Sequence, residues 1–211
     1  MNTKNISSRI LSPFLIIVVW VSLLVASTNG QQQTDAPALA EPPEAVPPDA
    51  MPQSPLPLVN PKIVVSKSGR KLELYSDDRV IRTYRIGLGL SPIEDKVRQG
   101  DHRTPEGEFY VCVKNANSKF YLSLGLSYPN MEDAARGLRD GLITKAQHDR
   151  IMSALKGKKR PPWDTALGGE IFIHGNGSQS DWTWGCVALE DAEMKELFDA
   201  VPLGTRVIIE K

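Results

Sequence analysis

A proline-rich stretch at residues 31–61 limits most strongly what this chain can fold into. It carries nine prolines and four acidic residues, and it has no Lys or Arg. Such a segment buries too little apolar surface to offset the entropy of ordering it, and proline biases it toward extended polyproline II. We therefore expect a disordered linker, serving either as a tether or as a plain spacer. A folded domain must come from residues 62–211, a length that suits one domain.

The first thirty residues have the pattern of a targeting segment. Lys4 and Arg9 precede an almost wholly apolar run at residues 10–26. That run is short for a membrane-spanning helix and slightly long for the core of a signal peptide. We expect residues 1–30 to be a signal peptide or an N-terminal membrane anchor. The domain would then work in the periplasm or cell envelope, with membrane contact only through residues 10–26 if they are retained.

Period-two patterns dominate the remaining sequence and predict strands. Turn residues such as Ser68-Gly69-Arg70 separate them. The predicted strands cover residues 62–65, 71–75, 80–86, 109–114, 122–126, 171–173 and 206–209. Short strands at this spacing predict a mostly β fold, an antiparallel β sandwich or a barrel-like sheet.

Helical periodicity replaces this pattern at three places. Residues 131–138 and 144–155 predict two short helices inserted between strands, with Thr144 as the N-cap of the second. Residues 191–200 predict a third, amphipathic helix. The inserted pair is a candidate lid over a cleft or a cover for one face of the sheet.

The stretch at residues 169–190 carries the candidate chemistry. A short apolar strand delivers His174, a polar loop follows, and Cys186 comes twelve positions later. An imidazole can take the proton of a thiol and so generate a nucleophilic thiolate. The spacing alone also fits a buried, unreactive cysteine, because free cysteine is among the most buried residue types.

The motifs around this pair resemble those of the YkuD-type L,D-transpeptidases. The strand ending in His174-Gly175, the short loop and the Thr183-x-Gly185-Cys186 sequence carry the resemblance. It implies that Cys186 is the nucleophile, that His174 is the base, and that the backbone carbonyl of Gly175 orients the imidazole. Backbone N–H groups around Gly185-Cys186 would stabilise the oxyanion, and Thr183 is a further candidate contact of the substrate or the oxyanion.

Two further elements extend the resemblance over residues 62–211. Thr104-Pro105-Glu106-Gly107 matches a family turn that feeds a core strand, and Gly204-Thr205 opens a closing strand typical of these domains. The resemblance implies a mostly β fold, no metal or organic cofactor, and peptidoglycan stem peptides as partners, with a wall-attached protein as a further candidate. His102 and Arg103, just before the turn, are candidate substrate contacts or plain solvated turn residues.

The chain departs from the family pattern at two positions, and both departures bear on substrate recognition. Trp184 stands where the family usually has a second histidine, and Ala188 stands where it usually has an arginine that assists carboxylate binding. Trp182 and Trp184 would make the cleft more apolar, and Asp181 is a candidate amine ligand. Tyr128 is either a substrate contact or a core aromatic residue.

The resemblance implies a reaction in which Cys186 forms a thioester with a stem tetrapeptide, releases D-alanine and passes the acyl group to an amine. An L,D-carboxypeptidase or releasing hydrolase on the same substrate stays open, as does a non-catalytic peptidoglycan-binding module. A disulfide between Cys112 and Cys186 would disable the nucleophile, so we expect Cys112 to be a small strand residue. The histidines and cysteines lack the close spacing of metal ligands.

Charge adds one exclusion. The whole chain has 25 basic and 25 acidic residues; without Lys4, Arg9 and the four linker acids, residues 62–211 keep 23 basic and 21 acidic residues, a net charge of +2. Nothing in that balance indicates a nucleic-acid partner.

Overall fold

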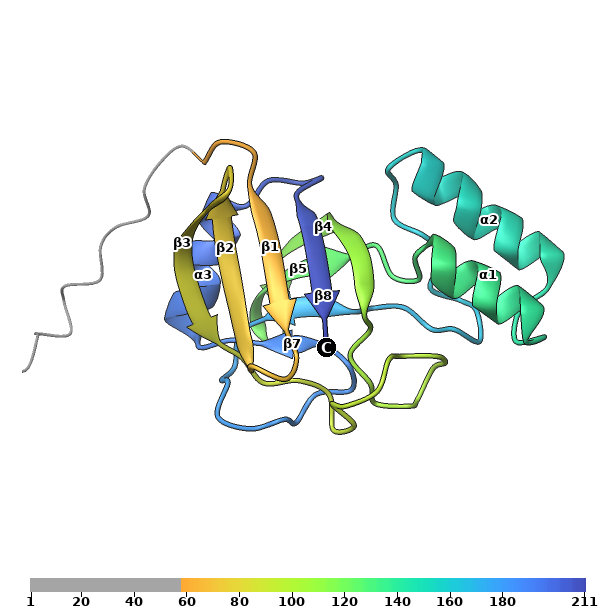
Figure 1. The fold of residues 1–211 in the computed structure, drawn as a ribbon, viewed down its shortest axis with the longest axis horizontal. Coiled ribbons are helices and arrows are strands. Elements are labelled where there is room, and N and C mark those ends of the chain that lie inside the picture. The colour runs from red at the N-terminus through yellow and green to blue at the C-terminus, as the bar shows by residue number, and fades with distance from the viewer. Residues whose placement is uncertain (1–57) are drawn as a thin grey trace, which may run out of the picture. The chain divides into compact units, whose positions relative to one another are not determined.

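One eight-stranded sheet organises the domain (Figure 1). The structure is a computed structural model that describes residues 58–211. In their order across the sheet, the strands are β3 (Arg79–Arg85), β2 (Lys71–Ser76), β1 (Lys62–Ser66), β8 (Arg206–Glu210), β4 (Gly107–Ser118), β5 (Tyr121–Leu126), β6 (Phe172–His174) and β7 (Val187–Ala188). The predicted mostly β architecture is confirmed.

The sheet is mixed, although the sequence pattern predicted an antiparallel one. β1 and β8 are parallel, with Ile63 opposite Val207, and β6 and β7 are parallel, with Ile173 opposite Val187. Period-two alternation shows that a segment is a strand with one buried face, but it carries no information on the direction of the neighbouring strand. The sheet is mixed because β1, the first strand of the domain, pairs in parallel with β8, the last strand.

The main core lies on one face of this sheet. Alternate positions of the strands are buried there, and helix α3 (Asp191–Ala200) adds Met194 and Leu197. The strand members include Ile63, Val65, Leu72, Leu74, Val207 and Ile209, each at most 1% exposed. Burying an aliphatic side chain of this size stabilises a fold by about 1.5–3 kcal/mol, so these strands hold their register firmly.

The predicted helical insertion is present as α1 (Met131–Arg139) and α2 (Lys145–Lys156). Asn130 and Thr144 cap the two helices, each accepting a hydrogen bond from the backbone N–H three residues further on. The pair packs on a second buried cluster of Tyr110, Ala134, Ile143, Ile151, Leu155 and Leu167. Figure 1 shows both helices beside the sheet, beyond β4. The insertion is therefore a side layer with its own core.

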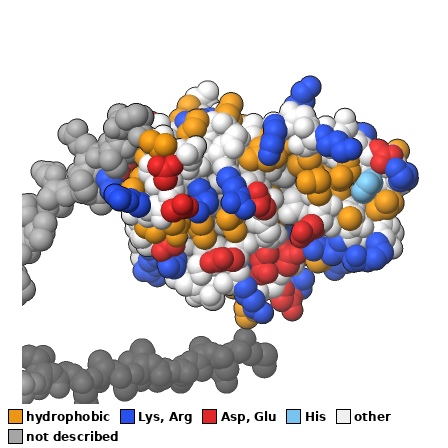
Figure 2. Space-filling view, turned by 45° about the horizontal axis from the view of Figure 1, so that its top comes forward, with side chains coloured by type: hydrophobic (Ala, Val, Ile, Leu, Met, Phe, Trp, Pro, Cys, Tyr) orange, Lys and Arg blue, Asp and Glu red, His pale blue; other side chains and the backbone are white. Residues whose placement is uncertain are grey.

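Lys and Arg side chains gather over this helical end of the molecule (Figure 2). Acidic side chains lie between them, as in the exposed pair Arg150–Asp164 at 3.1 Å. Pairs of this kind contribute little to stability because solvent screens them.

Two expectations fall on residues that the structure does not describe. The targeting segment at residues 1–30 and the linker up to residue 57 lie outside the described part of the chain. Within residues 58–211, no helix combines the length and the apolar character needed to cross a membrane.

Candidate active site

Strand pairing brings His174 and Cys186 to one face of the sheet. Ile173 on β6 and Val187 on β7 are register partners, and both side chains point into the main core. Because side chains alternate along a strand, the neighbouring His174 and Cys186 share the opposite face. Ideal strand geometry separates their Cα atoms by about 8 Å, a span that two side chains can bridge.

The imidazole of His174 is held in one orientation and one tautomer. Its Nδ1 lies 2.7 Å from the carbonyl oxygen of Gly175, which can only accept, so Nδ1 carries the proton and Nε2 keeps its lone pair. The ring stacks on Phe120, with centroids 4.7 Å apart, and meets the edge of Trp182 at 5.5 Å. Burial lowers the pKa of His174, and the Gly175 carbonyl only partly opposes that effect. The imidazole is therefore neutral near pH 7.

Close packing explains the glycine after this histidine. A Cβ atom at Gly175 would lie 2.4 Å from Asp191 Oδ1 and 3.1 Å from the Cβ of Tyr121. Asp191 Oδ1 in turn accepts the backbone N–H of Asn176 at 2.7 Å. The carbonyl that orients His174 is thus fixed by its surroundings on both sides.

The Cys186 thiol sits in a polar backbone environment at the edge of a pocket. Its Sγ accepts the N–H of Phe172 at 3.4 Å and lies 3.6 Å from the carbonyl oxygen of Glu170. Although the residue is only half-buried, burial raises the pKa of the thiol to about 11, against the opposing effects of the Phe172 N–H and the Lys96 ammonium. At rest the thiol is therefore protonated and the imidazole is neutral, so a base is needed to activate the thiol.

The turn before the cysteine depends on Thr183. Its Oγ1 donates to the carbonyl oxygen of Cys186 at 2.8 Å and accepts the N–H of Gly185 at 3.1 Å. Thr183 is 3% exposed, which corrects its expected place among the substrate contacts: it shapes the turn. The Gly185 N–H is likewise already bonded, so it is not the oxyanion donor that the motif suggested.

Gly185 has a different role, set by its backbone. Its φ of +125° lies in the region that favours glycine, and a Cβ there would lie 2.6 Å from the carbonyl oxygen of Arg103. The segment before β4 therefore packs directly on the residue that precedes the nucleophile. Arg103 itself pairs with Glu94 through its guanidinium.

A small pocket opens beside the thiol. Its volume is about 170 Å³, and its lining includes Cys186, Lys96, His102, Trp163 and Trp184. Trp184 is 74% exposed and stacks on His102, with ring centroids 5.4 Å apart. Two of the expected contacts, Trp184 and His102, thus lie where a ligand of the thiol would pass.

Two other expected contacts lie elsewhere. Tyr128 has 0% exposure, and its hydroxyl donates to the carbonyl oxygen of Leu167 at 3.1 Å, so it is a core residue and not a substrate contact. Asp181 is bound by Arg70, with Nη2 to Oδ2 at 2.7 Å, and also accepts the Leu88 N–H at 2.9 Å. It anchors the loop at residues 175–186, which corrects its expected role as an amine ligand.

Sequence reasoning missed Lys96 and Trp163. Lys96 lies in an aperiodic stretch that gave no strand or helix signal, and Trp163 follows two prolines that mark a connection. Trp163 donates from Nε1 to the Tyr128 carbonyl at 3.0 Å and packs on Gly169, where a Cβ would lie 2.1 Å from the indole. Only long-range packing places either side chain beside the thiol.

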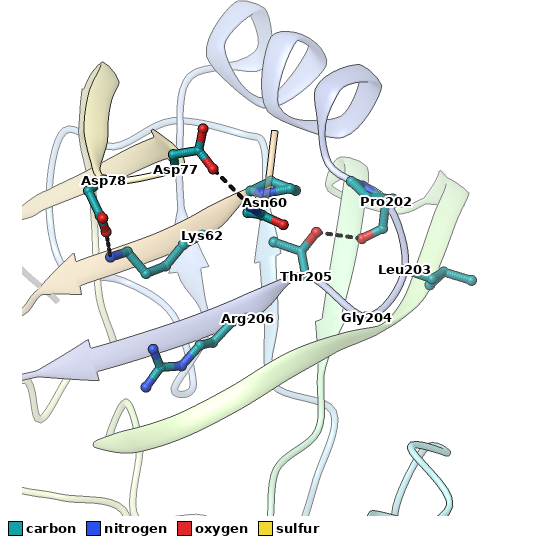
Figure 3. Close-up of a pocket in the computed structure, with 10 residues that line it drawn as sticks. Asn60, Lys62, Asp77, Asp78, Pro202, Leu203, Gly204, Thr205 and Arg206 are labelled. Carbon is teal, nitrogen blue, oxygen red and sulfur yellow. Dashed lines mark hydrogen bonds and ion pairs between the residues drawn. The ribbon is translucent and has the colours of Figure 1, made fainter. Parts of the chain in front are cut away.

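The remaining cysteine and the largest pocket are separate from this site. Cys112 is a free thiol on β4, packed against the second core cluster. A pocket of about 570 Å³ lies at the other end of β1 and β8, where Lys62 pairs with Asp78 and Asn60 donates to Asp77 (Figure 3). Its lining holds no thiol or imidazole. Among residues 58–211, no cluster of three or more His, Cys, Asp or Glu side chains is arranged to hold a metal.

Comparison with known proteins identifies the family. The YkuD model, described as the L,D-transpeptidase catalytic domain, matches residues 60–209, and the chain belongs to this family. "Putative L,D-transpeptidase YqjB" of Bacillus subtilis is 27% identical over 155 residues, which are 74% of this chain and 73% of that protein. "Putative L,D-transpeptidase YafK" of Escherichia coli is 32% identical over 82 residues, which are 36% of this chain and 33% of that protein.

Solved structures agree on the fold. The helical cell shape determining protein Pgp2 from Campylobacter jejuni superposes with a TM-score of 0.50 at 22% identity. The match covers 72% of this chain and 47% of Pgp2, so the chain spans about half the length of that solved protein.

Proposed function

We propose that this domain is a cysteine-dependent L,D-transpeptidase acting on peptidoglycan stem peptides. The observation that carries the proposal is the shared face of His174 and Cys186 on adjacent parallel strands, with Nε2 of the imidazole left to accept a proton. Membership of the L,D-transpeptidase family supports the substrate class, because the family acts on peptidoglycan peptides.

Acylation starts from the neutral pair. Nε2 of His174 takes the proton of Cys186 Sγ while the sulfur attacks the carbonyl that joins the third residue of a tetrapeptide stem to D-alanine. The imidazolium then gives this proton to the departing amine, so the C–N bond breaks and D-alanine leaves. A thioester on Cys186 remains, and His174 is neutral again.

The oxyanion of the tetrahedral intermediate needs donors close to the sulfur. Since the Gly185 N–H is bonded to Thr183, we assign this role to the backbone N–H of Cys186, at the end of the turn that Thr183 shapes. Removing one such donor typically lowers kcat by 10²- to 10³-fold, on the order of what oxyanion holes contribute elsewhere.

The second nucleophile decides the product. An amine of another stem gives a 3→3 cross-link, and an amine of a wall protein gives attachment. Water gives an L,D-carboxypeptidase, or a releasing hydrolase if the bond is to an attached protein. All four reactions pass through a thioester on Cys186. The apolar, signal-like run at residues 10–26 supports a location in the periplasm or cell envelope.

The test is intact-mass spectrometry of the purified protein with a disaccharide-tetrapeptide, beside the Cys186→Ala variant. We expect the wild type to gain the mass of the acyl group, to release D-alanine and to join two disaccharide-tetrapeptides into a cross-linked dimer. Cys186→Ala should do none of these.

The other outcomes separate the alternatives. Release of D-alanine without cross-linked substrate dimers would indicate a carboxypeptidase and not a transpeptidase. Absence of any acyl adduct on Cys186 would rule out the enzyme and leave a peptidoglycan-binding module.

A further inference from the structure

A buried lysine shares the pocket of the nucleophile. Lys96 precedes β4 in sequence and is only 3% exposed, yet it lines the same pocket as Cys186. Its Nζ donates to Asp101 Oδ1 at 2.7 Å and to the Arg98 carbonyl at 3.1 Å, and it lies 5.8 Å from the centroid of the Tyr128 ring. Taking an ammonium out of water is costly even when it is paired, so its presence here calls for a reason.

Holding the surrounding segment, residues 94–106, in place would be one such reason, but Lys67 already does this. Lys67 is 1% exposed and donates from Nζ to the Glu94 and Thr104 carbonyls, at 2.9 and 3.1 Å, and to Glu106 Oε1 at 2.7 Å. It ties the two ends of the 94–106 segment to β1. Lys67 does not line the pocket of Cys186, whereas Lys96 does.

The charged and titratable groups around Cys186 leave Lys96 as the cation that favours its ionised form. Glu170 lies on the pocket wall and opposes ionisation, and His174 on the neighbouring strand is neutral at rest. His102 lines the pocket under Trp184. Asp101, the carboxylate that pairs with Lys96, also accepts three backbone N–H groups, those of Val97, Arg98 and Arg103.

We propose that Lys96 is a positioning residue for the nucleophile: its buried ammonium stabilises the Cys186 thiolate while the proton moves from Sγ to Nε2 of His174. The proposal rests on the proposed function of Cys186. It supplies a fixed positive charge beside the nucleophile in a chain where the position two after the cysteine is Ala188, which is fully buried. No co-reactant is required, because only the S–H bond breaks and only the N–H bond forms.

The test measures the pH profile of thiol alkylation in the full-length protein. A Cys112→Ala background leaves Cys186 as the single thiol, and iodoacetamide labelling is followed by intact mass from about pH 6 to pH 11. Lys96→Met and Lys96→Arg are compared with Lys67→Met, the matched control that removes another buried lysine from the same segment. Thermal unfolding is recorded for each variant.

We expect Lys96→Met to slow alkylation about three- to tenfold at pH 8 and to move the profile to higher pH, because a thiolate without its cation is less populated. Lys96→Arg should keep the wild-type profile. Lys67→Met should lower Tm and leave the pH profile of Cys186 alkylation unchanged. Lys96→Gln keeps a donor for Asp101 without the charge and gives the same comparison if Lys96→Met does not fold.

Superimposable profiles for the wild type and the neutral Lys96 variants would overturn the proposal. An equal shift of the pH profile in Lys67→Met would also overturn the proposal, because it would show that loosening residues 94–106 is enough to change the reactivity of Cys186. Failure of the proposed function looks different. In that case the wild type is alkylated but forms no acyl adduct with the tetrapeptide, while the contrast between Lys96 and Lys67 variants is still measured.

Discussion

Both reacting side chains rest in their uncharged forms, and their surroundings rather than their types cause this. Burial among Phe120 and Trp182 disfavours the imidazolium of His174, and burial likewise disfavours the Cys186 thiolate. Under the proposed mechanism the proton therefore moves from the thiol to the imidazole during attack, in contrast to a preformed thiolate–imidazolium pair.

The first prediction is a pH profile. The active form has neutral His174, whose pKa lies below its ordinary value of about 6.5, and a protonated thiol with a pKa of about 11. The kcat/KM for D-alanine release should therefore rise with pH through an acid limb below about pH 6.5 and then stay level past about pH 9. An acid limb above about pH 7.5 would instead indicate a free thiolate as the reacting form.

The second prediction concerns Gly175. In Gly175→Ala the new methyl group meets Asp191 and Tyr121, so the turn after His174 must shift. We expect a loss of about 1–3 kcal/mol in the free energy of unfolding and a large drop in kcat, because the carbonyl that orients the imidazole moves. Urea denaturation and turnover measure the two effects. Gly157→Ala, whose new methyl would have only ordinary contacts, is the control and should leave both nearly unchanged.

The third prediction tests the placement of Tyr128 in the core. Tyr128→Phe removes the hydroxyl that bonds the Leu167 carbonyl and leaves that buried acceptor unpaired. We expect a loss of about 1–2 kcal/mol in stability with kcat and KM unchanged. A raised KM at wild-type stability would return Tyr128 to the list of substrate contacts.

At the scale of elements, a loop replaces the helix that usually joins two parallel strands. β6 and β7 are connected by residues 175–186, and polar contacts hold this loop in place of an apolar helix face. Asp181 binds Arg70, Glu190 accepts the N–H and the hydroxyl of Ser178, and Trp182 donates within the loop to Gly177. Such a connection leaves one side of the nucleophile open to a substrate.

The fourth prediction removes the loop anchor. Asp181→Ala removes the acceptor of Arg70 Nε and Nη2 and of the Leu88 N–H. The loop should therefore loosen and kcat should fall about tenfold or more, with roughly 1–2 kcal/mol lost in stability. Turnover and hydrogen exchange of residues 175–186 measure this. Glu108→Ala breaks the exposed pair with Arg206 and should change stability by less than about 0.5 kcal/mol. Wild-type turnover in Asp181→Ala would show that the anchoring of the loop by Asp181 does not affect the reaction.

At the scale of the whole molecule, the described domain begins before its first strand. The Val59 N–H donates to Ser76 Oγ, at the end of β2, at 3.0 Å, and Asn60 donates to Asp77 Oδ1, in the turn after β2, at 2.8 Å. These contacts close the end of the sheet where β1 enters, and none of the four residues lines the pocket beside Cys186. The start of the domain therefore belongs to its stability and not to its chemistry.

The fifth prediction compares two fragments. Residues 58–211 should unfold in one transition and keep the turnover of the full chain. Residues 62–211 lack the contacts of Val59 and Asn60 and should lose roughly 1–2 kcal/mol while kcat is unchanged. Thermal unfolding and D-alanine release report the two. A loss of turnover in residues 58–211 would show that residues 1–57 take part in the reaction.

The sequence by itself determined most of the strands and helices, and it singled out the two side chains that are the candidate nucleophile and base. These features are local: proline content, periods of two and of 3.6 residues, and a short motif around His174 and Cys186 are all written along the chain. The fold class followed from the same signals, because alternating strands with turns between them permit few architectures.

Only the tertiary structure decided the rest. The mixed sheet, the burial of Tyr128, the capture of Asp181 by Arg70 and the arrival of Lys96 beside Cys186 all depend on contacts between residues far apart in sequence. The type of a side chain tells which chemistry it can perform. Whether it contacts a ligand, the core or an opposite charge depends on packing between distant residues, which no local sequence pattern encodes.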